Sequence, residues 1–148
     1  MDRPHSVLFA CTLNAVRSPM AAGIMSHLMG PNVRVSSAGV RAGFPDPFAM
    51  AVMDELGIDV SEHEPRSFRD LGDEAFELII TLSPDAHHHG LELTQTMAAK
   101  VEYWPTLDVT ATAAGLPRKE VVRLYRQVRD ELFERIRLRF KVDGGPAV

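Results

Sequence analysis

Two kinds of hydrophobic pattern alternate along the chain. Four short runs are rich in apolar and strand-forming residues: HSVLFA (5–10), VRVSSAG (33–39), FELIITL (76–82) and KVEYW (100–104). Runs of this length and composition predict strands, and runs without a polar face predict a sheet that is covered on both sides.

Between these runs, apolar residues recur three and four positions apart, which is the spacing of an amphipathic helix. This spacing predicts helices over 17–30, 46–57, 83–97 and 117–140. Ser83 and Pro84 have the types preferred at the N-cap and first position of a helix. In the last segment one stripe of apolar residues predicts the buried face, namely Val121, Tyr125, Val128, Leu132 and Ile136.

Strands that alternate with helices predict an α/β fold with a parallel sheet. We therefore expect residues 1–148 to form a single three-layer domain, Rossmann-like, in which a four-stranded parallel sheet carries helices on both faces. The tail at 143–148 is expected to fray. In such folds, ligands bind beyond the carboxyl ends of the strands, where the strand order reverses.

The composition of the chain excludes several kinds of site and several classes of protein. The single cysteine among 148 residues excludes internal disulfides and cysteine-based metal clusters, and favours the reducing cytoplasm. No apolar run is long enough for a membrane span or a secretory signal. The net charge of −4 disfavours nucleic-acid binding. Residues 118–148 are nevertheless basic, with 9 Lys/Arg and 5 Asp/Glu, which fits a solvated helix face or a surface that attracts an acidic partner.

The stretch CTLNAVRS at 11–18 lies between the first predicted strand and the first predicted helix. A helix N-terminus offers free backbone N–H groups and a positive dipole, which bind anions. Arg17 adds a guanidinium that holds two oxygens at once, and the positive field favours a thiolate at Cys11. Thr12 or Ser18 can donate a hydrogen bond to that thiolate. The alternative is a cysteine that only packs in the core.

This stretch, extended to VLFACTLNAVRSPMAAG, resembles the phosphate-binding loop of low-molecular-weight protein tyrosine phosphatases and the related thioredoxin-coupled arsenate reductases, whose motif is C-x5-R-S. The segments VSSAG (35–39), ELGIDVSEH (55–63) and FELIITLSPD (76–85) extend the resemblance along nearly the whole chain. It implies the phosphatase type of α/β fold and a cysteinyl-phosphate intermediate on Cys11, stabilised by Arg17. The residues implied to bind substrate are Thr12, Leu13, Asn14, Ala15, Val16 and Ser18.

The resemblance also implies an aspartic acid that protonates the leaving group and then activates water. The family carries it after the fourth strand, often before proline. Asp108 is the only acidic residue between Glu102 and Glu120, so it is the candidate. Val109 replaces the usual proline, and a solvated carboxylate without a role remains the alternative.

Other residues depart from the family pattern or invite a second interpretation. Leu13 replaces the glycine of many phosphatases and bears on substrate range, while Val16 stands where some members carry a second cysteine. Trp104 or Tyr103 is a candidate aromatic wall, although packing in the core is the favoured interpretation. The run HHHG (87–90) does not fit a metal site, because consecutive helical side chains point about 100° apart. Asp85 is either a first-turn acid or a residue that orients the loop.

Three functions follow from these observations. The first is a cysteine-dependent phosphomonoesterase that acts on a phosphotyrosine protein or a small aryl phosphate and binds inorganic phosphate or another oxyanion. The second is an arsenate reductase that uses an external thiol, because the chain has no second cysteine. The third is a phosphate- or phosphopeptide-binding module without turnover. We expect a cytoplasmic monomer or weak homodimer with no cofactor, metal, membrane or nucleic acid.

Overall fold

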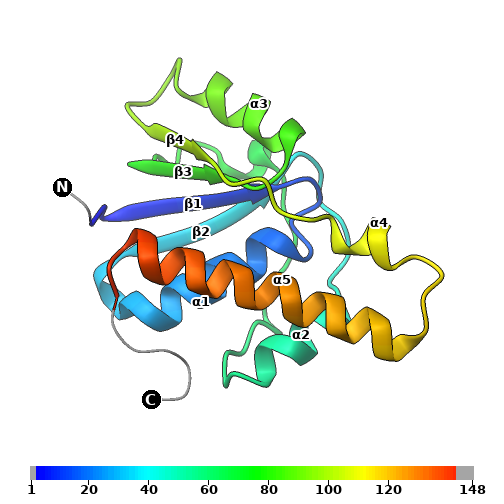
Figure 1. The fold of residues 1–148 in the computed structure, drawn as a ribbon. Helices are drawn as coiled ribbons and strands as arrows, with labels where there is room; N and C mark the ends of the chain where they lie inside the picture. Colours follow the sequence, from blue (N-terminus) through cyan, green and yellow to red (C-terminus); the bar gives the residue numbers. More distant parts are fainter. Residues whose placement is uncertain (1–2, 143–148) are drawn as a thin grey trace.

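Figure 1 shows the computed structural model, which describes residues 3–142. The frayed tail that we expect at 143–148 lies outside the described residues. The strands are β1 (Ser6–Cys11), β2 (Arg34–Gly39), β3 (Leu78–Thr81) and β4 (Lys100–Tyr103). The helices are α1 (Arg17–Met29), α2 (Pro47–Asp54), α3 (Pro84–Leu93), α4 (Val109–Ala113) and α5 (Arg118–Arg139), with 3-10 turns at Gly30–Asn32 and Phe68–Leu71.

The four strands form one parallel sheet in the order β2-β1-β3-β4. β1 lies at the centre between β2 and β3, and all six of its residues are buried. The strand order therefore reverses next to β1. The loop that follows Cys11 begins at this reversal, which is where ligands bind in open parallel sheets.

Helices cover both faces of the sheet (Figure 1). α1 and α5 pack together on one face, where α5 also contacts α2 and α4, and α3 lies on the other face. A large apolar cluster fills the α1/α5 side and a smaller one, around Leu8 and Ile79, fills the α3 side. The prediction of a single α/β domain with a four-stranded parallel sheet and helices on both faces is confirmed.

The predicted elements end within a few residues of the observed ones, and the elements that were not predicted are α4 and the two 3-10 turns. Ser83 caps α3 as expected, and the α5 stripe faces the core, with Val121 half-buried at its start. The sequence of α4 does not predict a helix, because its five residues VTATA include β-branched types and span little more than one helical turn.

Candidate functional site

The loop between β1 and α1 closes around a pocket of about 190 Å³. Cys11 is the last residue of β1, and Arg17 is the first residue of α1. Asn14, in the middle of the loop, has a left-handed backbone with φ of 53°, a conformation that asparagine tolerates better than most residues. The pocket is lined by Cys11, Thr12, Leu13, Ala15, Val16, Arg17, Arg41, Asp108, Val109 and Thr110.

The thiol of Cys11 is almost enclosed, with 2% of the residue exposed. Its Sγ lies 3.0 Å from the Oγ of Ser18, which is fully buried. Ser18 has a single hydroxyl proton, and its other acceptor, the carbonyl oxygen of Ala38, is more distant at 3.4 Å. Either atom of the Cys11–Ser18 contact can supply its proton, and donation from Ser18 Oγ to Sγ is the direction that would stabilise a thiolate. Asn14 Nδ2 donates to the same Oγ at 2.8 Å, which leaves the hydroxyl proton free for that contact.

Asn14 links the loop to a second segment of the chain. Its Oδ1 accepts a hydrogen bond from the backbone N–H of Arg66 at 2.9 Å, and its carbonyl oxygen lies 2.9 Å from Nε2 of His63. The side chain is fully buried and points at Ser18 and Arg66, so it holds the loop in shape and does not line the pocket. Because Asn14 contacts Ser18 and Ser18 contacts Cys11, these two side chains connect segment 63–66 to the thiol.

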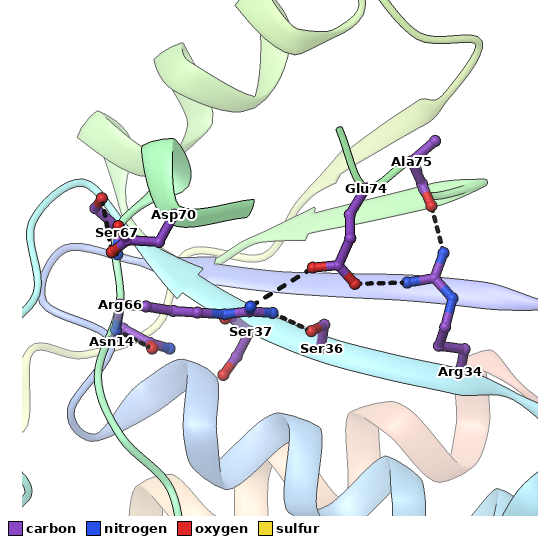
Figure 2. Close-up of polar contacts among 9 residues, drawn as sticks. All are labelled: Asn14, Arg34, Ser36, Ser37, Arg66, Ser67, Asp70, Glu74 and Ala75. Carbon is purple, nitrogen blue, oxygen red and sulfur yellow. Dashed lines mark hydrogen bonds and ion pairs between the residues drawn. The ribbon is translucent and has the colours of Figure 1, made fainter. Parts of the chain in front are cut away.

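Arg66 is itself fixed to the sheet (Figure 2). Its Nε donates to the carbonyl oxygen of Ser37 at 3.0 Å, and Nη2 donates to Ser36 Oγ. Nη1 forms an ion pair with Glu74 at 3.5 Å, and Glu74 also pairs with Arg34 at 3.1 Å. The backbone carbonyl of Arg66 accepts the Gly39 N–H at 2.9 Å. These contacts make Arg66 a positioning residue that supports the loop from behind.

Gly39, at the end of β2, allows the next segment to approach the loop. A Cβ at this position would lie 2.7 Å from the Asn14 nitrogen and 2.8 Å from the Arg41 carbonyl oxygen. Both neighbours are backbone atoms, so any larger residue would push the loop and segment 40–43 apart. The glycine that ends β2 is thus explained by close backbone packing.

Thr12 anchors the start of the loop to α3. Its Oγ1 donates to Asp85 Oδ1 at 2.9 Å, a carboxylate oxygen that also accepts from Ser83 Oγ at 2.7 Å. Partial burial raises the pKa of Asp85, but hydrogen bonds led by those from Ser83 and Thr12 outweigh it, so the pKa lies below its usual value. Asp85 is therefore both a first-turn residue of α3 and a contact of the loop, and the two interpretations of it are compatible.

Arg17 joins the two sides of the pocket. Its guanidinium is largely buried; Nη1 donates to the carbonyl oxygen of Thr106 at 3.2 Å, and Nη2 donates to Thr12 Oγ1 at 3.4 Å. Thr106 belongs to the segment that leads from β4 to Asp108. Its N–H donates to Leu82 O at 3.1 Å, so this segment is also tied to the residue that follows β3.

Asp108 lies on the pocket wall opposite the loop, in an exposed position. It is the N-cap of α4, and its Oδ1 accepts a 3.4 Å hydrogen bond from the Ala111 N–H. The structure thus brings the three predicted catalytic residues, Cys11, Arg17 and Asp108, to one pocket. Of the predicted binding residues, Thr12, Leu13, Ala15 and Val16 line it, while the side chains of Asn14 and Ser18 lie behind it.

Three pocket residues were missed in the sequence: Arg41, Val109 and Thr110. For Arg41 a signal existed, because it closely follows the carboxyl end of a strand that neighbours β1. Leu13 is 39% exposed and lines the pocket, as expected of an apolar wall at the entrance.

The other candidate residues lie elsewhere. Trp104 packs in the core edge-on against Phe9, with ring centroids 6.2 Å apart, as the favoured interpretation predicted. Tyr103 stacks on His87 at 4.5 Å, and neither lines the pocket. His89 stacks on Phe68, and among residues 3–142 no group of three or more His, Cys, Asp or Glu side chains is placed to hold a metal ion. Within the same residues, no helix combines the length and apolar character of a membrane span.

Arsenate reductases and a low molecular weight protein tyrosine phosphatase resemble this chain over most of its length. An arsenate reductase of Shouchella clausii is 35% identical over 132 residues, which are 88% of this chain and 91% of the relative. The low molecular weight protein tyrosine phosphatase of T. tengcongensis has a similar structure, with a TM-score of 0.69, 30% identity, and coverage of 88% and 94% of the two chains. An arsenate reductase in its phosphate-binding state matches with a TM-score of 0.68 at 25% identity, covering 93% and 98%.

A sequence model of one family matches residues 6–140, and this range contains every pocket residue described above. The match includes the C-x5-R-S loop, the parallel sheet behind it and the long final helix. The chain belongs to the low molecular weight phosphotyrosine protein phosphatase family.

Proposed function

We propose that this protein is a cysteine-dependent phosphomonoesterase that hydrolyses phosphotyrosine or a similar aryl phosphate. The observation that carries the proposal is the joint presence of Cys11, Arg17 and Asp108 on one small pocket at the reversal of strand order. A nucleophile, a guanidinium for phosphate oxygens and a carboxyl group for proton transfer are the groups that phosphoryl transfer through an enzyme intermediate requires.

In the first step, the thiolate of Cys11 attacks phosphorus. An S–P bond forms while the P–O bond to the aryl group breaks, and Asp108 gives its proton to the leaving phenolate. Arg17 and the loop N–H groups hold the non-bridging oxygens as charge shifts among them. Ser18 Oγ, which lies 3.0 Å from Sγ, is placed to donate a hydrogen bond that stabilises the thiolate between turnovers.

In the second step, Asp108, now ionised, takes a proton from water as the water oxygen attacks phosphorus. The S–P bond breaks, inorganic phosphate leaves, and Cys11 returns to the thiolate. One carboxyl group thus serves as acid and then as base. The apolar pocket residues Leu13, Val16 and Val109 fit the ring of an aryl ester better than a polar alkyl phosphate.

Hydrolysis of p-nitrophenyl phosphate and phosphotyrosine, under reducing conditions between mildly acidic and neutral pH, tests the proposal. We expect turnover by the wild type and none by Cys11→Ser. An inactive wild type overturns the proposal. Phosphate binding by calorimetry without turnover would instead point to a binding module.

A second candidate, arsenate reduction, is favoured by the name of the Shouchella clausii relative. Reduction of arsenate to arsenite consumes two electrons, which thiols supply by forming a disulfide. Cys11 is the only cysteine of the chain, so a thiol from outside must provide the second sulfur. A thiol-containing reaction with arsenate should then consume reductant at a rate that depends on Cys11, and no consumption would remove this candidate.

The compartment and assembly follow the same chemistry. We propose the reducing cytoplasm, because a catalytic thiolate is lost on oxidation to sulfenic and higher acids. We also propose that the protein works as a monomer or weak homodimer, since a single copy already supplies the thiol, the guanidinium and the carboxyl group that the proposed reaction needs.

A further inference from the structure

Arg41 is a second guanidinium on the wall of the pocket. The segment that carries it is fixed to the Cys11 loop. The Arg41 N–H donates to Thr12 O at 2.9 Å, and the Gly43 N–H donates to Leu13 O at 2.9 Å. Gly39 brings the two backbones into close contact just before it. The position of the Arg41 backbone relative to the Cys11 loop is therefore set by these contacts.

The Arg41 guanidinium has no partner among the described residues of the protein. Its side chain is exposed, and within residues 3–142 its guanidinium makes no hydrogen bond or ion pair. Arg17 and Arg66 differ, because Arg17 binds the Thr106 carbonyl and Arg66 pairs with Glu74. Asp108, the one carboxylate on the pocket wall, is bonded to its own helix through the Ala111 N–H.

The requirements of a phosphate group are met without Arg41. The N-terminus of α1, the loop N–H groups and Arg17 already provide positive potential at the bottom of the pocket. A further, unpaired guanidinium on the wall offers a planar pair of donors to a second anion, and a carboxylate fits that pair well. The rest of the chain carries a net negative charge and repels acidic ligands, so this local charge is what favours them.

We propose that Arg41 forms a subsite for a carboxylate next to the phosphate ester, so that the preferred substrate is a phosphotyrosine flanked by an acidic residue. This inference rests on the proposed phosphatase activity, because it names the substrate class of the same site. The phosphate lies at Cys11 and Arg17, the aryl ring lies along Leu13 and Val109, and the flanking carboxylate reaches Arg41.

Two phosphotyrosine peptides that differ only by Glu or Gln beside the phosphotyrosine test the subsite. We expect the wild type to prefer the Glu peptide by about 1.5-fold to fivefold in kcat/KM at low ionic strength, the range of an exposed charge pair. The preference should shrink as salt screens it. Arg41→Gln should bring the ratio of the two peptides to about one. Arg69→Gln, which removes an exposed arginine outside the pocket, should keep the wild-type ratio.

The side chain of Arg41 makes no bonds within the described residues, so Arg41→Gln should melt at the wild-type temperature. Two results would overturn the subsite: equal kcat/KM for both peptides in the wild type, or a preference that survives Arg41→Gln. Turnover of p-nitrophenyl phosphate in the same experiment would show that the proposed phosphatase activity still holds. The same two peptides with a non-hydrolysable phosphonate in place of the phosphate should show the same preference for Glu over Gln in their Kd values, which calorimetry measures. That measurement tests whether Arg41 binds the flanking carboxylate even if no ester is hydrolysed.

Discussion

The two sides of the pocket are built in opposite ways. The side that carries Cys11 is buried and held by many hydrogen bonds, which pass from Ser18 through Asn14 to Arg66 and the sheet. On the side that carries Asp108, the carboxyl group is exposed, and the side-chain hydrogen bond that it accepts is a capping bond of 3.4 Å. A nucleophile needs a fixed line of attack on phosphorus, whereas an acid that later becomes a base needs contact with both the leaving group and water. Arg17 is the direct polar link between the two sides.

The largest effect is expected at Cys11. Cys11→Ser replaces the thiolate with a neutral hydroxyl that the pocket does not ionise, and kcat should fall by roughly 10⁴-fold or more. Steady-state hydrolysis of p-nitrophenyl phosphate measures it. The fold should persist, because the two side chains are nearly equal in size. Residual turnover above one per cent of wild type would show that another group can act as the nucleophile.

Asp108→Asn removes the carboxyl group on the exposed side of the pocket and leaves the buried side unchanged. The amide cannot transfer the proton, so kcat should fall by roughly 10²- to 10⁴-fold. The loss should be smaller for p-nitrophenyl phosphate than for phosphotyrosine, because nitrophenolate leaves more easily without a proton. Equal activity of the variant and the wild type on phosphotyrosine would assign the acid to another residue.

Asn14→Ala tests whether the buried side owes its shape to side-chain bonds. The change removes bonds to Ser18 and the Arg66 N–H and places alanine at a positive φ, so unfolding free energy should fall by about 2–3 kcal/mol. Denaturant unfolding measures this loss. Asp108→Asn, run in parallel, should change stability by less than about 0.5 kcal/mol. If both variants lose equal stability, the two sides do not differ as described.

Glu55 lies away from both sides of the pocket, so a substitution there serves as a control that changes stability and leaves catalysis unchanged. It pairs with Arg126 and Arg129 at 2.7 Å each and so joins the end of α2 to α5. Hydrogen bonding from Arg126 is the main cause that lowers the Glu55 pKa to about 2, against burial, and Arg129 adds to it. Because the folded pKa lies below the unfolded value of 4.5, the stabilisation is full above that pH and is lost as pH falls toward 2.

Glu55→Gln should therefore cost about 1 kcal/mol or less at neutral pH, since the pair is partly exposed and screened. The difference from wild type should vanish near pH 2, and kcat should not change. Urea unfolding at several pH values measures it. A difference that is constant with pH would mean that the ion pairs do not stabilise the α2–α5 contact.

The sequence predicted the buried side of the site well and the exposed side poorly. Cys11 and Arg17 lie within one short loop, so their spacing and the flanking strand and helix define their geometry locally. Asp108 was found by elimination, and its place on the pocket wall depends on the path of the chain after β4. Arg66 reaches the loop from a segment that is distant in sequence, and no local pattern encodes that contact. Arg41 could have been found from its place just after the carboxyl end of a strand that neighbours β1. α4 was missed because its short sequence has low helix propensity and depends on packing against α5.

The most direct test of the proposed chemistry is to trap the cysteinyl-phosphate. Wild type and Asp108→Asn are denatured rapidly during turnover of p-nitrophenyl phosphate, and their peptides are weighed by mass spectrometry. We expect one phosphoryl group on the peptide that contains Cys11, with more of it in Asp108→Asn because that variant activates water poorly, and none in Cys11→Ser. Turnover with no phosphate on Cys11, or with phosphate on a different residue, would contradict the account.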